Sequence, residues 1–290
     1  MPETQTIDVP LSRVCFAGGG QRAAVCRRIK IHDTMKKFVK AVLRKFGVIL
    51  LKRSSGVYLP EGESYRIVCG LCGRQDPVII DGGAHRGGSV AAFSSLAPEA
   101  QFHCFEPDPV LADSLRTIFA GKGNVKVVQA ALGESRGCSN FNINASRPTN
   151  SLLQMAEGLQ PNLRDLCQAV AQIEVEVTTL DAYCRENGLG RVDIVKLDLQ
   201  GYDYMALRGA RSVLRETSVV MVEVLFVEIY KGCRLFPDIL GLMHELGFDL
   251  YTLCGLQYGE ESKLLWADAI FIKKGRREDG ETNNRIALPA

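Results

Sequence analysis

Two carboxylates, each at the end of a short apolar run, are the residues of this chain best suited to chemistry. Asp81 follows the apolar residues 78–80 and opens a glycine-rich turn, and Glu106 ends a second run 25 residues later. Glycines let a backbone approach a ligand closely, and the first amides of a following helix present the positive end of the helix dipole. A carboxylate ending the next strand can accept hydrogen bonds from both hydroxyls of a ribose. The pattern predicts a site for a nucleoside cofactor.

The spacing of the turn indicates which cofactor. A dinucleotide-binding turn reads G-x-G-x-x-G, and residues 81–87 contain no register with three glycines at those intervals. The turn reads D-x-G-x-x-x-G instead, which resembles the first motif of S-adenosylmethionine-dependent methyltransferases. We therefore expect S-adenosylmethionine as the cofactor.

The elements around this turn alternate between strand and helix, which favours a parallel, right-handed doubly wound sheet. The expected strands are residues 78–80, 101–105, 125–129, 193–198, 219–225, 248–253 and 269–273, and the expected helices are 88–96, 110–119, about 203–214 and 236–246. Two alternating strands at 138–143 and 173–177 interrupt this rhythm and flank a polar loop at 147–151. This insertion lies where it can cover the cofactor.

Composition is consistent with a large packed domain. The chain has 290 residues, 46% of them hydrophobic, and a net charge of +2 with a charged fraction of 23%, so the overall charge gives no indication of a nucleic-acid partner. No run of 18 apolar residues and no secretory signal is present. We expect a soluble, cytoplasmic protein with an N-terminal extension (residues 1–75), a catalytic domain (residues 76–274) and a polar tail (residues 275–290).

The N-terminal extension carries a basic amphipathic helix over about residues 31–51. Eleven Lys and Arg residues lie between Arg22 and Arg53, with Asp33 as the only acid. The helix can pack its apolar face on the catalytic domain and expose a basic face. The alternative is peripheral contact of residues 31–53 with anionic lipid, or contact with an acidic polymer substrate.

The ten cysteines are scattered, as expected for small buried hydrophobic residues in a reducing compartment. Cys69 and Cys72 have the spacing of half a zinc site, but no second pair follows and no histidine has a matching spacing. We expect a reduced pair on a loop before the first strand, and no metal.

Seven motifs taken together resemble the FkbM family of S-adenosylmethionine-dependent methyltransferases. They are VIIDGGAHRGG (78–88), CFEPDP (104–109), NSLL (150–153), TTLDAY (178–183), DIVKLDLQGY (193–202), LRGA (207–210) and WADAIF (266–271), and the match covers roughly residues 78–273. The resemblance implies a Rossmann-like class I methyltransferase fold, α/β with a seven-stranded, mainly parallel sheet and helices on both faces. It also implies O-methylation of a sugar, polysaccharide or other natural product, with the acceptor left open.

The resemblance also implies where the cofactor binds. Glu106, followed by Pro107, would hold the ribose, Ala130 and Ala131 would lie near the adenine, and Asp198 near the methionine amino group or the acceptor. Asp81, Gly82, Gly83, Ala84 and Gly87 would shape the methionine pocket, with Gln200 also contributing to the cofactor site. Each acid has an alternative role as the cap of the next helix.

A hydroxyl acceptor needs a base or a metal to assist removal of its proton. The candidate catalytic residues are Asp198, which we favour, His85 in the glycine turn, and Glu223 near the end of the fifth strand. His85 can equally be a solvated turn residue, and Glu223 can balance a buried cation. Gln200 stands where the family often has Glu, which removes a carboxylate and weakens any metal-site interpretation.

Two other classes of protein remain open from the sequence. One is a non-catalytic methyltransferase-like domain that binds the cofactor or acts as a scaffold, and the intact cofactor positions argue against it. The other is a nicotinamide-dependent oxidoreductase, which the turn spacing disfavours. The expected acceptor is a small molecule or carbohydrate and not nucleic acid, because the catalytic region has no clustered basic and aromatic stripe.

Overall fold

The structure, a computed structural model, describes residues 62–275. The predicted basic helix at residues 31–51, its proposed lipid contact through residues 31–53, and the tail beyond residue 275 lie outside the described residues. Between residues 62 and 275, no helix is long and apolar enough to cross a membrane.

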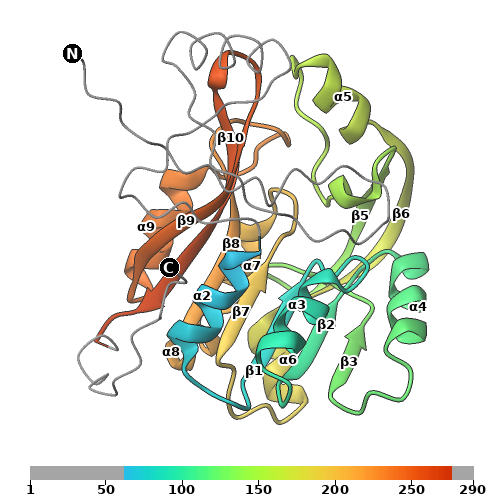
Figure 1. The fold of residues 1–290 in the computed structure, drawn as a ribbon. Coiled ribbons are helices and arrows are strands. Elements are labelled where there is room, and N and C mark those ends of the chain that lie inside the picture. The colour runs from blue at the N-terminus through green and yellow to red at the C-terminus, as the bar shows by residue number, and fades with distance from the viewer. Residues whose placement is uncertain (1–61, 276–290) are drawn as a thin grey trace, which may run out of the picture. The chain divides into compact units, whose positions relative to one another are not determined.

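A seven-stranded sheet forms the centre of the described chain (Figure 1). Its order is β3-β2-β1-β7-β8-β10-β9, and β10 is antiparallel to both of its neighbours while the other pairs are parallel. The strands are β1 (Val78–Gly82), β2 (Gln101–Phe105), β3 (Val125–Val128), β7 (Ile194–Leu197), β8 (Val219–Leu225), β9 (Phe248–Tyr258) and β10 (Leu264–Lys273). The predicted mainly parallel, seven-stranded sheet is confirmed.

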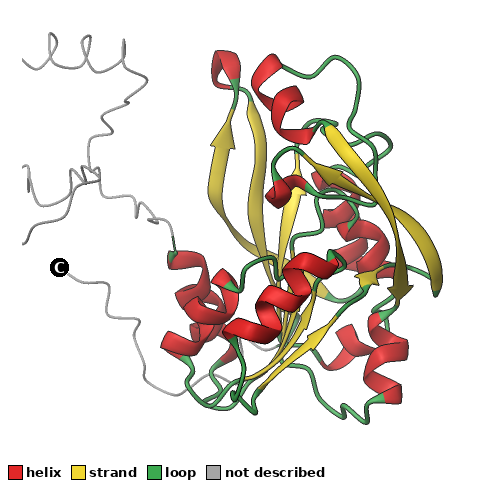
Figure 2. Ribbon diagram, turned by 90° about the vertical axis from the view of Figure 1, so that its right-hand side faces the viewer, coloured by secondary structure: helices red, strands yellow, loops and turns green. Residues whose placement is uncertain are grey.

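Helices cover both faces of this sheet, as the side view in Figure 2 shows. Successive strand residues such as Ile79 and Ile80 point to opposite faces, and they belong to separate apolar clusters. One cluster includes residues of α2 (Glu63–Cys72), α3 (Gly88–Leu96) and α4 (Pro109–Ile118), and the other includes residues of α6 (Leu180–Glu186), α7 (Asp203–Arg208), α8 (Val213–Glu216) and α9 (Phe236–Glu245).

Helix α2 corrects the interpretation of the cysteine pair. Cys69 and Cys72 lie on this helix and not on a loop, and α2 ends at Gly73, whose amide donates to the carbonyl of Cys69. Val68 and Cys72, one helical turn apart, are buried against the sheet, which explains why the segment is helical. A helix from the expected extension is therefore part of the packed core. No cluster of metal-binding side chains occurs among the described residues.

The predicted helix from about residue 203 to 214 is divided into two. A Cβ atom on Gly209 would lie 2.0 Å from the carbonyl oxygen of Gly133, so this close backbone contact requires glycine and interrupts the helix. Helix α8 then restarts where the Asp181 carboxylate accepts hydrogen bonds from the amides of Ser212 and Val213. That carboxylate acts as a helix cap supplied by another helix.

The insertion forms a second, three-stranded sheet of order β4-β6-β5. Strands β5 (Gly137–Asn144) and β6 (Ala169–Thr178) are antiparallel and longer than predicted, and β4 (Ala131–Leu132) pairs parallel to β6. Between β5 and β6 lie the short helices η1 (Arg147–Thr149) and α5 (Pro161–Cys167), and η2 (Glu260–Ser262) joins β9 to β10. Figure 1 shows α5 and the long strands β5 and β6 together, beyond the β3 edge of the main sheet.

Candidate active site

A cavity of about 700 Å³, including its open mouth, lies where β1, β2 and β7 end. Ligands of open α/β sheets bind at the carboxyl ends of the strands. Its lining residues are Gly83, His85, Phe105, Glu106, Pro107, Leu111, Ala130, Ala131, Leu132, Phe141, Arg147, Pro148, Asn150, Leu152, Asp198, Leu199, Gln200 and Tyr202.

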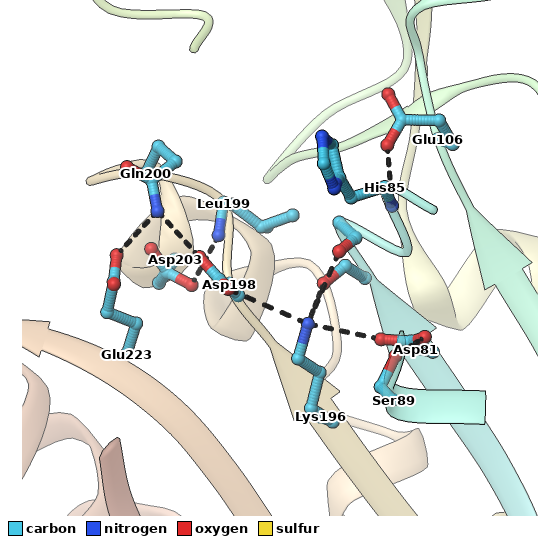
Figure 3. Close-up of polar contacts among 12 residues, drawn as sticks. Asp81, His85, Ser89, Glu106, Lys196, Asp198, Leu199, Gln200, Asp203 and Glu223 are labelled. Carbon is cyan, nitrogen blue, oxygen red and sulfur yellow. Dashed lines mark hydrogen bonds and ion pairs between the residues drawn. The ribbon is translucent and has the colours of Figure 1, made fainter. Parts of the chain in front are cut away.

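A buried ion pair between Asp81 and Lys196 supports the glycine turn after β1 (Figure 3). The Asp81 carboxylate accepts a hydrogen bond from Ser89 Oγ and lies 3.2 Å from Lys196 Nζ. Burial opposes the charge of Lys196, but Asp81 and Asp198 together raise the pKa of its ammonium group. Asp81 does not line the cavity, and its contacts with Ser89 and Lys196 support the turn.

Gly83, like His85, is a residue of this turn that lines the cavity. Its amide and that of Ala84 donate to the carbonyl of Phe105, which ties the turn to β2. Gly82, Ala84 and Gly87 are buried and lie outside the lining. Of the five residues expected to shape the methionine pocket, Gly83 alone lines the cavity, and the others position it.

Glu106 follows β2 directly and lines the cavity together with Pro107. Its carboxylate accepts hydrogen bonds from the backbone amides of His85, at 2.9 Å (Figure 3), and Asp108, at 3.0 Å. Burial raises the pKa of Glu106 to about 7, although the two amide hydrogen bonds act in the opposite direction. These amides orient the carboxylate at the cavity wall.

The insertion forms one wall of the cavity. Phe141 of β5 and Leu152 contribute apolar surface and pack in one cluster with Ala131, at the edge where adenine is expected. Arg147 on η1 lines the cavity and pairs with the buried carboxylate of Asp108. The segment predicted to cover the cofactor therefore lies against its pocket.

The three candidate bases occupy different positions (Figure 3). Asp198 lines the cavity with its side chain 39% exposed. His85 also lines it, and His85 Nε2 is buried without a hydrogen-bond partner among the described residues. Burial and the charge of Arg86 lower the pKa of the His85 ring, which favours its neutral form. Glu223 does not line the cavity, and Gln200 lies between it and Asp198.

Two residues of the site had no role in the sequence analysis. Lys196 precedes Asp198 by two positions, a spacing that places both on one face of an extended chain, so its contact with Asp198 could have been predicted. Its contact with Asp81 joins two distant segments and could not. Tyr230 donates a hydrogen bond to Gln200 Oε1 from the irregular segment after β8. No periodicity marks that segment, so the sequence gives no signal for this contact.

The buried carboxyl of Asp203, on α7, is expected to make the stability of the protein depend on pH. Burial, with the charge of Asp198, raises its pKa from 3.8 to about 7. The folded state then holds a proton that the unfolded state releases, so the contribution of Asp203 to stability is present below pH 4 and is lost as the pH rises to about 7. Asp203→Asn keeps the side-chain oxygen that accepts from the Leu199 amide and should remove most of this loss.

Urea unfolding of both proteins between pH 4 and 8 measures the effect. The variant should gain roughly 3 kcal/mol relative to the parent across this range. Asp165→Asn, at an exposed position, is the matched control and should run parallel to the parent. Parallel curves for Asp203→Asn as well would show that this carboxyl is not protonated in the folded state.

The fold and the cavity together define a class I S-adenosylmethionine-dependent methyltransferase. The residues fit this cofactor, because a carboxylate for ribose hydroxyls, apolar surface for adenine and Asp198 border one cavity. The model of the Methyltransferase FkbM domain matches residues 81–250, more than half of the chain. The chain belongs to the FkbM methyltransferase family, and S-adenosylmethionine is its cofactor.

Two curated relatives are methyltransferases. The chain is 28% identical over 211 residues to the 2-O-methyltransferase NoeI of Sinorhizobium fredii (strain NBRC 101917 / NGR234), covering 69% of this chain and 83% of that protein. It is 26% identical over 197 residues to the methyltransferase sdnD of Sordaria araneosa, covering 60% and 74%.

A solved structure, the magnesium protoporphyrin IX methyltransferase of Synechocystis PCC 6803 with bound cofactor, is 10% identical. It covers 82% of this chain and 96% of its own with a TM-score of 0.41, a likeness that carries no argument about the acceptor.

Proposed function

We propose that this methyltransferase transfers its methyl group to a hydroxyl oxygen of a sugar, polysaccharide or other small natural product. The observation that carries the proposal is a carboxylate, Asp198, that lines the cofactor cavity with part of its side chain exposed. The name of the relative NoeI, a 2-O-methyltransferase, supports oxygen as the methylated atom. A small acceptor, and not nucleic acid, is the partner proposed here.

The cofactor supplies an electrophilic methyl group on a sulfonium, and the chain's residues supply positioning and a proton acceptor. The acceptor oxygen would take the methyl group from the sulfur of the bound cofactor, and the Asp198 carboxylate would accept the hydroxyl proton. Positioning two reactants can lower the barrier by roughly 7 to 11 kcal/mol. The base adds a smaller factor, since general base catalysis contributes about 10²- to 10⁴-fold.

Other residues of the site have proposed roles at the cofactor. Glu106 accepts hydrogen bonds from the ribose hydroxyls, and Ala130 and Ala131 contact the adenine. Gly83 and Gln200 line the methionine part of the cavity. Glu223 is the weakest candidate for the base, because Gln200 lies between its carboxylate and Asp198.

His85 is the second candidate for the base. A neutral ring with an unpartnered Nε2 at the cavity can accept a proton. Asp198→Asn and His85→Gln therefore need to be compared in one assay. We expect about 100-fold slower turnover for Asp198→Asn, with affinity for S-adenosylhomocysteine within about threefold, and a smaller loss for His85→Gln.

The assay offers radiolabelled S-adenosylmethionine to the full chain with a panel of mono- and oligosaccharides, hydroxylated natural products and an RNA control. The methylated product is isolated and the position of the methyl group is assigned by NMR. A methyl ether on a sugar or natural product supports the proposal. Labelling of RNA, or of nitrogen in any acceptor, would contradict it, and full turnover by Asp198→Asn would remove Asp198 as the base.

A further inference from the structure

We propose that Gln200, held in place by Tyr230, is the positioning residue for the Asp198 carboxylate. Gln200 Nε2 donates to Asp198 Oδ1 at 2.7 Å and to Glu223 Oε2 at 3.0 Å, and Gln200 Oε1 accepts from Tyr230 Oη at 2.6 Å. The inference rests on the proposed function only because that function makes Asp198 the base. The test below measures the titration of the Asp198 carboxyl and needs no acceptor.

The backbone presents Gln200 in an unusual conformation. Gln200 has a φ of 53°, in the left-handed region that residues other than glycine seldom adopt. Such a conformation is strained and persists where surrounding contacts hold it. The Gln200 carbonyl accepts from Ser151 Oγ at 2.8 Å, and the side chain makes the three hydrogen bonds above. Both ends of the residue are therefore fixed.

Hydrogen-bond chemistry decides which way the amide of Gln200 points. Two carboxylates, Asp198 and Glu223, face one end of the amide, and a carboxylate oxygen requires a donor there. The opposite end faces Tyr230, whose pKa burial raises, so its hydroxyl keeps a proton to donate. A reversed amide would set its oxygen against both acids. The orientation with Nε2 toward the acids is the one that satisfies every group.

Asp198 has both positive and negative groups around it, so a change in the hydrogen bond from Gln200 is expected to change the protonation of Asp198. Lys196 Nζ lies 3.8 Å from Asp198 Oδ2, so Gln200 and Lys196 each contact one oxygen of the carboxylate. The charged or titratable groups around Asp198 are Lys196, Asp81, His85, Asp203, Glu223, Tyr230, Asp268 and Tyr65. Four of these groups are carboxyls, and the neutral amide of Gln200 lies between Asp198 and one of them, Glu223, whose pKa burial raises.

Tyr230 also connects this arrangement to the insertion. Its hydroxyl lies 3.0 Å from the carbonyl of Thr149, on η1, and the tyrosine is fully buried. Ser151 of the insertion also donates a hydrogen bond to Gln200. The insertion that forms one wall of the cavity therefore contacts the residue that orients Asp198. The insertion thus contributes to the geometry of the catalytic carboxylate as well as covering the pocket.

The test follows the Asp198 carboxyl by ¹³C NMR in the full chain labelled at aspartate Cγ, with the signal assigned from Asp198→Asn. Gln200→Met removes both donors at similar length, and Gln200→Glu replaces them with a third carboxylate. Both changes favour the protonated acid, so the midpoint of the titration should move up by about one pH unit or more. Gln101→Met, at the exposed start of β2, should leave the midpoint unchanged.

A merely structural role for Gln200 would lower stability without moving this midpoint. A midpoint within about 0.2 pH units of the parent in either folded Gln200 variant would overturn the proposal. Tyr230→Phe provides a further check, because loss of its hydroxyl frees the amide to rotate and should give a smaller shift of the same sign. Since the midpoint is read without an acceptor, failure of the proposed O-methylation would leave this result standing, and the reverse also holds.

Discussion

Glu106→Ala should weaken binding of S-adenosylhomocysteine by on the order of 1,000-fold. A hydrogen bond to a charged group contributes about 1.5 to 3 kcal/mol, and the carboxylate is proposed to accept one from each ribose hydroxyl. The Ala variant also leaves the amides of His85 and Asp108 without their present acceptor. Titration calorimetry on the full chain measures the loss, and circular dichroism establishes that the variant is folded.

Two comparisons make this result specific. Glu99→Ala, at an exposed position, should bind as the parent does, and Glu106→Gln should fall between the parent and Glu106→Ala. Burial raises the pKa of Glu106 to about 7, so affinity should increase between about pH 6 and 8 as the carboxylate ionises. Affinity that is independent of pH in the parent, or unchanged in Glu106→Ala, would assign the ribose to another residue.

Gly83→Ala should abolish measurable binding of the cofactor and destabilise the protein. Gly83 has a φ of +74°, and a Cβ atom there would lie 2.1 Å from the carbonyl oxygen of Asp198. Left-handed strain and displacement of the backbone after β7 together cost about 4 kcal/mol. That cost should lower the melting temperature by roughly 10 °C.

Gly88→Ala is the matched control for this substitution. Gly88 begins α3, and no atom lies within 4 Å of the position that its Cβ would take. Alanine also has a higher helix propensity than glycine by roughly 1 kcal/mol. The control should bind cofactor normally and melt at the same temperature or slightly higher. A Gly83→Ala variant that behaves like this control would show that the turn is free to move away from Asp198.

The main sheet could be predicted because its strands carry local signals. Buried parallel strands are apolar runs, and β8 agrees with the predicted residues 219–225 in both bounds. The glycine turn and Glu106 could be predicted for the same reason, since their role depends on where a strand ends. The cavity then brings together Gly83, Glu106 and Asp198, the residues that directly follow β1, β2 and β7.

Contacts between distant segments could not be predicted. The break between α7 and α8 depends on the approach of Gly209 to Gly133, which no local pattern records. Similarly, Arg147 could be read as part of a polar loop, but its pairing with Asp108 requires the insertion to be folded against α4. Helix α2 was not predicted because it is short and only two of its apolar residues, Val68 and Cys72, are fully buried, while Tyr65, Ile67 and Leu71 pack at the edge of the cluster.

The shared wall of the cavity has a thermodynamic consequence. Because both the insertion and the sheet line the pocket, any ligand that needs both surfaces binds more tightly to the chain with its insertion docked. Linkage is reciprocal. Docking of the insertion strengthens ligand binding by a certain free energy, and ligand binding stabilises the docked insertion by the same free energy. Saturation with S-adenosylhomocysteine should therefore slow amide hydrogen exchange in β5 and β6, at residues that the ligand itself never touches.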